Sequence, residues 1–129
     1  MRLANKVTLI TGSGSGIGKA SALRFAAEGA TVVVNDLNAE QGQGTVDEIV
    51  AAGGKAAFYQ ADVTNPEQVK AMAERIVADH GRIDVLFNNA GVSGVGMLHE
   101  VEPEAWDRVV NINIRGVFLP SKFVLPYMM

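Results

Sequence analysis

The sequence predicts an α/β fold built on a doubly wound parallel sheet. Four short runs of apolar and β-branched residues begin near Lys6, Thr31, Lys55 and Ile83, and segments with helical periodicity lie between them. Two of these runs, 32–34 and 85–87, are continuously apolar, as expected for parallel strands that are buried on both faces. Strands and helices that alternate in this way indicate βαβ units, and we expect four strands in the order 3-2-1-4.

Three helices are expected between these strands. The helix over 66–80 has the clearest signals, because Asn65 can cap its first turn and Gly81 follows its last. Its apolar positions follow the helical repeat at Val69, Met72, Ala73, Ile76 and Val77. The helix over roughly 39–52 contains two glycines, which lower its helix propensity. The first helix follows a glycine-rich loop directly.

The last segment, 104–129, is expected to form one long helix. Its apolar stripe would consist of Trp106, Val109, Val110 and Val117. The chain ends on apolar residues without a C-terminal glycine or a basic last turn, and the strand at 85–87 would lie at an edge of the sheet. We therefore expect residues 1–129 to be the N-terminal part of a single larger domain whose later strands are missing here. On its own, this part is expected to be inactive.

Composition argues against several classes of protein. The 129 residues are 48% hydrophobic and 19% charged, which is typical of one globular domain. A net charge of −3 gives no basic surface for a nucleic acid or an anionic membrane, so neither is expected as a partner. The sequence has no cysteine and only two histidines, so no metal site is expected. Its first apolar run, 7–10, is too short for a signal peptide or a membrane span, and we expect a cytoplasmic protein.

The most informative segment is the loop after the first strand, Thr11-Gly12-Ser13-Gly14-Ser15-Gly16-Ile17-Gly18. A strand that turns into a helix here points free backbone N–H groups and the positive end of the helix dipole at one place, where a phosphate can bind. A G-x-G-x-x-G motif would need glycine at Ile17, and a Walker-type loop would need a hydroxyl at Ala20. The pattern is therefore T-G-x-x-x-G-x-G. Taken alone, it is also compatible with a tight turn that binds nothing.

Together with Asp36, Asp62-Val63, the Asn-Asn-Ala-Gly segment 88–91 and Asn113, this loop resembles the short-chain dehydrogenase/reductase family over nearly the whole chain. The resemblance implies a Rossmann-type, NAD(P)-binding domain. The cofactor-binding residues that it implies are Gly12, Ser13, Ser15, Gly16, Ile17, Gly18, Asp36, Leu37, Asp62, Val63, Asn89, Ala90 and Gly91. The substrate would be a small alcohol or ketone, and we expect the intact protein to be a homo-oligomer.

Asp36 follows the second strand, where a carboxylate can accept both hydroxyls of an adenosine ribose. The alternative is a solvated turn residue or an acid at a helix N-terminus. Family members that prefer NADP usually carry a basic residue at the position of Ser15 or of Leu37. Neither residue is basic here, and Asp36 would repel a 2′-phosphate, so NAD is the expected cofactor.

By the same resemblance, Asp62 and Val63 bind the adenine, with the carboxylate accepting a hydrogen bond from the exocyclic amine. Asn89 would contact the adenosine ribose region. On the sequence alone, Asp62 is explained nearly as well by an Asx turn before Pro66, and Asn89 by a turn after the fourth strand.

Asn113 shares the expected apolar stripe of the last helix. A buried amide needs hydrogen-bond partners, and a neighbouring loop could supply them. The resemblance implies a catalytic role, because the matching asparagine distorts this helix and holds a water in the proton relay. The family's catalytic serine and Tyr-x-x-x-Lys pair have no match, since Val63 stands four residues after Tyr59 and Tyr127 is followed by only two residues.

We therefore expect an NAD-dependent oxidoreductase that moves a hydride between nicotinamide and an alcohol or ketone, with Asn113 as the one catalytic residue in this chain. The alternative is a non-catalytic dinucleotide-binding module, which would not need the serine, tyrosine and lysine. A phosphoacceptor receiver domain would need paired acids after the first strand, where Thr11-Gly12 stands, and is set aside.

Overall fold

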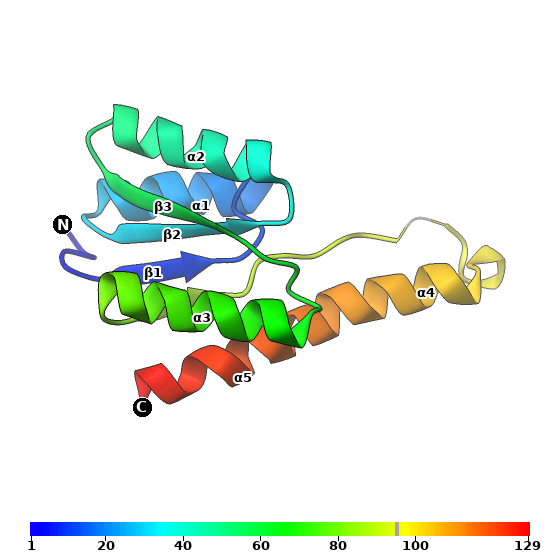
Figure 1. The fold of residues 1–129 in the computed structure, drawn as a ribbon. Helices are drawn as coiled ribbons and strands as arrows, with labels where there is room; N and C mark the ends of the chain where they lie inside the picture. Colours follow the sequence, from blue (N-terminus) through cyan, green and yellow to red (C-terminus); the bar gives the residue numbers. More distant parts are fainter. Residues whose placement is uncertain (95) are drawn as a thin grey trace.

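The computed structural model describes residues 1–94 and 96–129. In chain order its elements are β1 (Val7–Ile10), α1 (Gly16–Ala27), β2 (Thr31–Asp36), α2 (Ala39–Ala51), β3 (Lys55–Gln60), α3 (Pro66–His80), β4 (Val85–Phe87), the short 3-10 helix η1 (Leu98–Glu100), α4 (Pro103–Val110), the π-helix η2 (Asn111–Arg115) and α5 (Gly116–Met128). The four strands form one parallel sheet in the order β3-β2-β1-β4, which confirms the predicted topology (Figure 1).

Helices cover the sheet on both faces. α1 and α2 lie on one face, and α3 and α5 lie on the other (Figure 1). Neighbouring residues of a strand point to opposite faces, so Leu9 packs with the side chains of α3 whereas Ile10 packs with those of α1 and α2. Val33 and Val34 of β2 divide in the same way, and all four side chains are fully buried. The continuously apolar run of β2 is thereby explained, whereas β4 lies at the edge of the sheet and is only half-buried.

α3 begins and ends as predicted. The Oδ1 atom of Asn65 accepts a hydrogen bond from the backbone N–H of Gln68 at 3.1 Å, and Gly81 adopts the left-handed conformation, with φ of 82°, after the last turn. The predicted apolar face lies on the sheet, with buried side chains at Val69, Met72, Ala73 and Ile76.

α2 forms despite its two glycines, because packing requires one of them. A Cβ on Gly42 would clash with the ring of Phe58, so glycine lets the helix lie directly on β3. A Cβ on Gly44 would meet nothing within 4 Å among the described residues. The side chain of Asn38 caps the helix by accepting from the backbone N–H of Gln41 at 2.9 Å. A tertiary contact and a cap therefore offset the low propensity.

The segment predicted as one long helix is helical but interrupted. After α4, five residues form the π-helix η2, and α5 then resumes the α-helical pattern. A π-turn closes its hydrogen bonds over one more residue than an α-turn, so a stripe counted at α-helical spacing does not continue across it. The prediction of one unbroken helix over 104–129 is therefore wrong.

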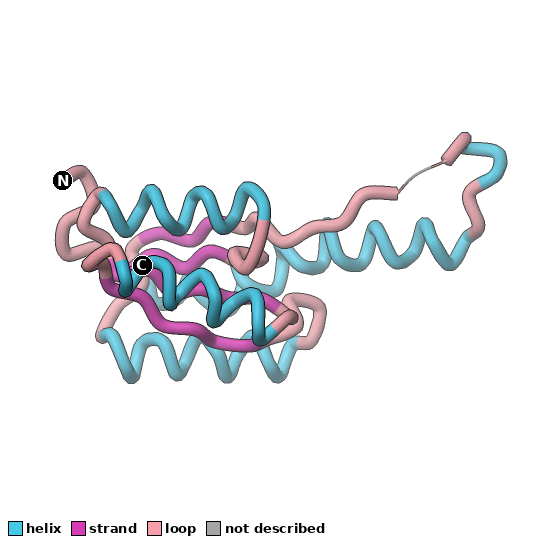
Figure 2. The backbone as a smooth tube through the Cα atoms, turned by 90° about the horizontal axis from the view of Figure 1, so that it is seen from above, coloured by secondary structure: helices cyan, strands magenta, loops and turns pink. Residues whose placement is uncertain are grey.

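The predicted apolar stripe is also wrong. Trp106 is 58% exposed and Val117 is 39% exposed, whereas the buried side chains of α5 are those of Leu119, Pro120 and Val124. α4 and the loop before it extend beyond the end of the sheet (Figures 1 and 2), and α4 has no buried residue among those described. No helix in the described parts of the chain is long and apolar enough to cross a membrane.

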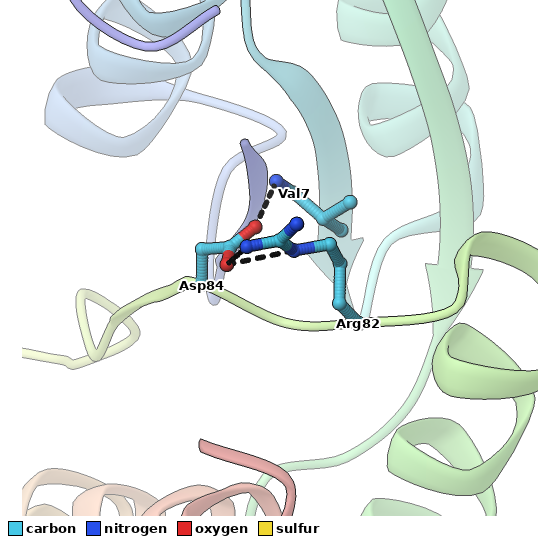
Figure 3. Close-up of polar contacts among 3 residues, drawn as sticks. All are labelled: Val7, Arg82 and Asp84. Carbon is cyan, nitrogen blue, oxygen red and sulfur yellow. Dashed lines mark hydrogen bonds and ion pairs between the residues drawn. The ribbon is translucent and has the colours of Figure 1, made fainter. Parts of the chain in front are cut away.

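Asp84 joins the start of β1 to the segment that leads into β4 (Figure 3). Its carboxylate accepts a hydrogen bond from the backbone N–H of Val7 at 2.9 Å and pairs with the guanidinium of Arg82 at 2.6 Å. Partial burial raises the pKa of this carboxyl, but the hydrogen bonds from Arg82 and Val7 and the charges of Arg82 and Lys6 outweigh it and bring the pKa below the ordinary 3.8. The fold therefore stabilises the ionised form.

We expect Asp84 to make stability depend on acid pH. Because the pKa of Asp84 is lower in the folded than in the unfolded chain, its contribution is complete above the unfolded value near 3.8 and is lost as the pH falls through the lower folded value. Asp84→Asn should lower the free energy of unfolding near neutral pH, and this difference from the wild type should shrink below about pH 4. Urea titrations of both proteins measure this difference in the free energy of unfolding. A difference that does not vary with pH would contradict the role given to the Asp84 carboxylate.

Candidate functional site

A cleft of about 460 Å³ lies at the carboxyl ends of the strands. Open parallel sheets bind ligands at this end, at the point where the strand order reverses, which here is between β1 and β4. The loops after the four strands and the α4–η2 segment supply its lining residues: Gly12, Ser15, Ile17, Asn35, Asp36, Leu37, Ala61, Asp62, Val63, Thr64, Asn89, Ala90, Gly91, Val92, Arg108 and Ile112.

The glycine-rich loop turns β1 directly into α1. Gly12 and Gly16 have positive φ values of 64° and 55°, which favour glycine. A Cβ on Gly18 would clash with the carbonyl of Gly12, so this glycine lets the first turn of α1 pack on the loop. The side chain of the N-cap, Ser15, makes no hydrogen bond to the helix, and no acidic residue lies in the first turn. Unlike the N-terminus of α2, which Asn38 caps, the N-terminus of α1 is therefore open to an anion.

Thr11 joins the end of β1 to the end of β4. It is fully buried, and its Oγ1 accepts hydrogen bonds from the backbone N–H groups of Asn89 and Ala90, both at 3.0 Å. Asn89 returns the contact, because its Nδ2 donates to the carbonyls of Thr11 and Gly12 at 3.1 and 3.2 Å. These bonds fix the loop after β4 against the glycine loop.

Ser13 and Asn35 continue the connection across β2 and β3. The backbone N–H of Ser13 donates to the carbonyl of Asn35 at 2.9 Å, and its Oγ accepts from the N–H of Asn35 at 3.2 Å. The Nδ2 of Asn35 donates to the carbonyls of Tyr59 and Ala61 at 3.0 and 3.2 Å. Thr11, Ser13 and Asn35, here called the strand-end polar residues, are all buried and together connect the carboxyl ends of all four strands.

Asp36 ends β2, as expected, and it lines the cleft. Its Oδ2 accepts a hydrogen bond from the N–H of Gly14, and its Oδ1 accepts from the N–H of Asn38, each at 2.9 Å. A carboxylate oxygen can accept more than one hydrogen bond, so these contacts orient the group and leave acceptor capacity for a ligand. They also fix Asp36 against the glycine loop, where a Cβ on Gly14 would lie 2.7 Å from Oδ2.

Asp62 forms the Asx turn that was the alternative to adenine binding, and it also lines the cleft. Its Oδ1 accepts hydrogen bonds from the backbone N–H of Thr64 at 2.9 Å and from the hydroxyl of Thr64 at 2.7 Å, which is an Asx turn before α3. Val63, between them, is buried and lines the same cleft. The turn and a ligand contact are compatible, because the turn uses only one carboxylate oxygen.

Asn113 is exposed, which corrects the expectation that it is a polar residue on a buried stripe. It lies in η2, and its amide pairs with a single residue of the loop after β4. The Nδ2 atom donates to the carbonyl of Val92 at 2.7 Å, and Oδ1 accepts from the N–H of Val92 at 2.8 Å. Its neighbour Ile112 and its partner Val92 line the cleft, whereas Asn113 is not among the lining residues. A neighbouring loop thus supplies the partners, and the catalytic role stays a prediction.

Most of the predicted cofactor-binding residues line the cleft, but Ser13, Gly16 and Gly18 do not. Ser13 and Gly18 are buried beneath the loop, and Gly16 is exposed at the start of α1. Asn35 and Arg108 also line the cleft, although neither was predicted as a site residue. Asn35 could have been recognised as a polar residue directly after three buried valines. Arg108 carried no such signal, because an exposed arginine on a helix is also typical of a solvated surface.

Tyr59 lies apart from the cleft, at the other end of α3. Its hydroxyl donates to Asp79 and lies 3.2 Å from Nε2 of His80. Burial, together with the hydrogen bond and the negative charge of Asp79, raises the pKa of Tyr59 to about 12. A tyrosine that serves as a general base near neutral pH needs a lowered pKa, so Tyr59 is unsuited to that role. In the described residues, no three histidine, aspartate or glutamate side chains lie together as a metal site would require.

Comparison with known proteins identifies the family. The family model described as short chain dehydrogenase matches residues 6–129. This chain belongs to the short-chain dehydrogenase family. The members are oxidoreductases that use a nicotinamide cofactor, and the cleft of this chain lies where open α/β sheets bind their ligands.

Two curated relatives illustrate how far the similarity extends. The 3-oxoacyl-[acyl-carrier-protein] reductase of Thermotoga maritima is 47% identical over 128 residues, which are 99% of this chain and 52% of the relative. Cyclohexanol dehydrogenase of an Acinetobacter species is 48% identical over 123 residues, which are 95% of this chain and 49% of the relative. The chain thus spans about half the length of the curated relatives it matches.

Solved structures share the fold. The hydroxysteroid dehydrogenase of Escherichia coli superposes with a TM-score of 0.92 at 38% identity, over 98% of this chain and 54% of the other. A metagenomic short-chain oxidoreductase in complex with NADP also gives a TM-score of 0.92, at 36% identity, over 99% of this chain and 58% of the other. The fold of this chain is therefore that of the matching part of its solved relatives.

Thr11→Val should destabilise the fold more than Thr11→Ser does. Valine removes the oxygen that accepts from the N–H groups of Asn89 and Ala90, and an orphaned buried donor costs about 1–3 kcal/mol. Serine keeps the hydroxyl and loses one methyl group, worth about 1 kcal/mol. Urea denaturation followed by circular dichroism measures both, and equal losses in the two variants would contradict the role given to the hydroxyl.

Proposed function

We propose that this short-chain dehydrogenase binds NAD in the strand-end cleft and, in the protein as its gene encodes it, transfers a hydride between nicotinamide and a small alcohol or ketone. The observation that carries the proposal is that the open N-terminus of α1 and the carboxylate of Asp36 belong to the same cleft. The helix N-terminus favours an anion, and the carboxylate favours a neutral hydrogen-bond donor such as a ribose hydroxyl.

The lining residues fit the parts of a dinucleotide. The N-terminus of α1, where Ser15 and Ile17 line the cleft, is complementary to a pyrophosphate. Asp36 would accept from the adenosine ribose, and Val63 and Asp62 would hold the adenine. The cleft volume of about 460 Å³ lies within the usual range for ligand pockets, about 300–1,000 Å³.

Asp36 favours NAD over NADP. Ser15 and Leu37, where NADP-binding relatives usually carry a basic residue, are uncharged and line the cleft. A 2′-phosphate beside Asp36 would meet a like charge. Two observations point the other way: Arg108 also lines the cleft, and one solved relative is in complex with NADP. The preference is therefore the property that tests the proposal most directly.

The chain would contribute binding and orientation, while the bound nicotinamide supplies the carbon that accepts or donates the hydride. The amide of Asn113 is fixed by its two hydrogen bonds to Val92. One amide hydrogen and one carbonyl lone pair remain on this side chain, because each end makes a single bond to Val92. We propose that Asn113 uses them to hold a water that passes the substrate proton to solvent.

The proposed substrate class follows from the names of the relatives. Cyclohexanol dehydrogenase and cyclopentanol dehydrogenase are named for secondary alcohols, and 3-oxoacyl-[acyl-carrier-protein] reductase is named for a ketone. Each of these reactions interconverts a secondary alcohol and a ketone. We propose the same couple for this protein.

Calorimetric titration with NAD and NADP tests the cofactor. We expect NAD to bind roughly ten- to hundredfold more tightly, because a hydrogen bond to a charged group is worth about 1.5–3 kcal/mol. Asp36→Asn keeps an oxygen that can accept from the N–H of Gly14 but loses the negative charge. It should therefore narrow the difference between the affinities for NAD and for NADP. Arg108→Ala is the control for the other side of the cleft. Arg108→Ala should prefer NAD over NADP by the same factor as the wild type.

Two results would contradict the cofactor assignment. Equal wild-type affinities would remove the preference, and loss of NADP binding in Arg108→Ala alone would place the 2′-phosphate at α4. Failure to bind either dinucleotide would overturn the proposal as a whole. Dinucleotide binding without NADH formation from any secondary alcohol would favour the non-catalytic binding module.

Asn113→Leu tests the proposed proton relay. We expect kcat to fall about a hundredfold or more, as for a lost general acid–base group, while the melting temperature and the NAD affinity change little. Asn111→Leu is the matched control, since Asn111 is also an exposed asparagine of η2. Absorbance of NADH reports the rates. An unchanged kcat in Asn113→Leu, or an equal fall in both variants, would assign Asn113 a structural role only.

A further inference from the structure

The π-helix η2 lies between two walls of the cleft. Asn113 binds Val92 of the loop after β4, with its two bonds at 2.7 and 2.8 Å. Two residues later, Nε of Arg115 donates to the carbonyl of Thr64, in the loop after β3, at 3.1 Å. Residues two apart on a helix point to different sides, so the two side chains reach in different directions. η2 therefore links the loop after β3 to the loop after β4.

The loop after β3 makes a second contact with this helical segment, at the first residue of α5. A Cβ on Gly116 would lie 2.8 Å from Cγ2 of Val63, so glycine lets the backbone of the helix lie directly on the valine. Gly116 and Val63 are both buried. The hydrogen bond of Arg115 and the packing of Gly116 thus act on adjacent residues of one loop.

Thr64 transmits this contact to the carboxylate of Asp62. Its N–H and its hydroxyl both donate to Oδ1 of Asp62, at 2.9 and 2.7 Å. Asp62, Val63 and Thr64 all line the cleft, whereas Arg115 is not among the lining residues. A change at Arg115 can therefore reach the cleft through Thr64 without removing a group from it.

We infer that Arg115 is a positioning residue for the adenosine end of the cleft: it holds the Asp62–Thr64 turn against η2 and so sets the place of the Asp62 carboxylate and the Val63 side chain. This inference rests on the proposed dinucleotide function. It assigns the role to the hydrogen bond from Arg115 to Thr64 rather than to the charge of the guanidinium.

AMP and nicotinamide mononucleotide, the two halves of NAD, allow binding at the two ends of the cleft to be measured separately. In the protein as its gene encodes it, Arg115→Ala should weaken binding of AMP and of NAD by about three- to tenfold, the loss expected for one hydrogen bond of ordinary strength. Binding of nicotinamide mononucleotide should not change. Arg115→Lys, whose ammonium can donate to the same carbonyl, should restore most of the AMP affinity. Lys122→Ala, at an exposed position of α5, is the control and should bind AMP like the wild type.

Two further measurements distinguish positioning from attraction of charge. The AMP defect of Arg115→Ala should persist at about 1 M salt, where the Debye length is about 3 Å. Without any nucleotide, amide exchange in the peptide that contains Asp62–Thr64 should be faster in Arg115→Ala than in the wild type.

Several outcomes would overturn the inference. These are unchanged AMP binding, equal weakening of AMP and nicotinamide mononucleotide, a defect that disappears at high salt, and unchanged amide exchange. A wild-type protein that binds neither AMP nor NAD would instead overturn the proposed function itself.

Discussion

The structure depends on how four strands that end at one edge of a sheet are held together beyond the last ladder hydrogen bond. Past that point the backbone groups have lost their partners in neighbouring strands, and buried groups without partners are costly. Three short, buried side chains add bonds at this edge. Thr11 connects β1 to β4 and Ser13 connects β1 to β2, both beyond the end of β1, while Asn35, still in register with Tyr59, connects β2 to β3 through its side chain. These bonds hold the strand ends together at the base of the cleft.

Close approach of backbones is the second part of this arrangement. A Cβ on Gly12 would lie 2.9 Å from the Cα of Ala90, and a Cβ on Gly18 would lie 2.5 Å from Nδ2 of Asn89. The glycine loop and the end of β4 are thus in contact with no room for side chains between them. The strand-end polar residues connect the strand ends at the base of the cleft, and η2 is bonded to the loops after β3 and β4.

Much of the fold could be predicted because its signals are local. The cap at Asn65, the stop at Gly81 and the apolar face of α3 can each be read within one helix, and the buried run of β2 follows from its composition. The glycine loop was recognisable for the same reason, since the T-G-x-x-x-G-x-G pattern and the strand before it are continuous in sequence. Most of the expected cleft residues followed from this pattern and from the positions of the strand ends.

The errors concern features that depend on distant residues. Helical spacing predicts a straight helix over 104–129, but it contains no information about the π-turn at Asn111–Arg115, whose side chains are held by Val92 and Thr64. The exposure of Trp106 follows from the position of α4 beyond the sheet, which periodicity cannot reveal. Gly42 is the converse case, because a residue that lowers helix propensity is required by the ring of Phe58.

The two hydrogen bonds that the carboxylate of Asp36 already accepts have a consequence for evolution. The same side chain that would select the ribose also holds the N–H of Gly14 and the N–H of Asn38. A lineage that exchanges Asp36 for a basic residue would lose both acceptors at once, one for the glycine-rich loop and one for the turn before α2. The N–H of Asn38 is exposed and can bond to water instead, whereas the N–H of Gly14 belongs to a buried residue, so an exchange at Asp36 also acts on the glycine-rich loop.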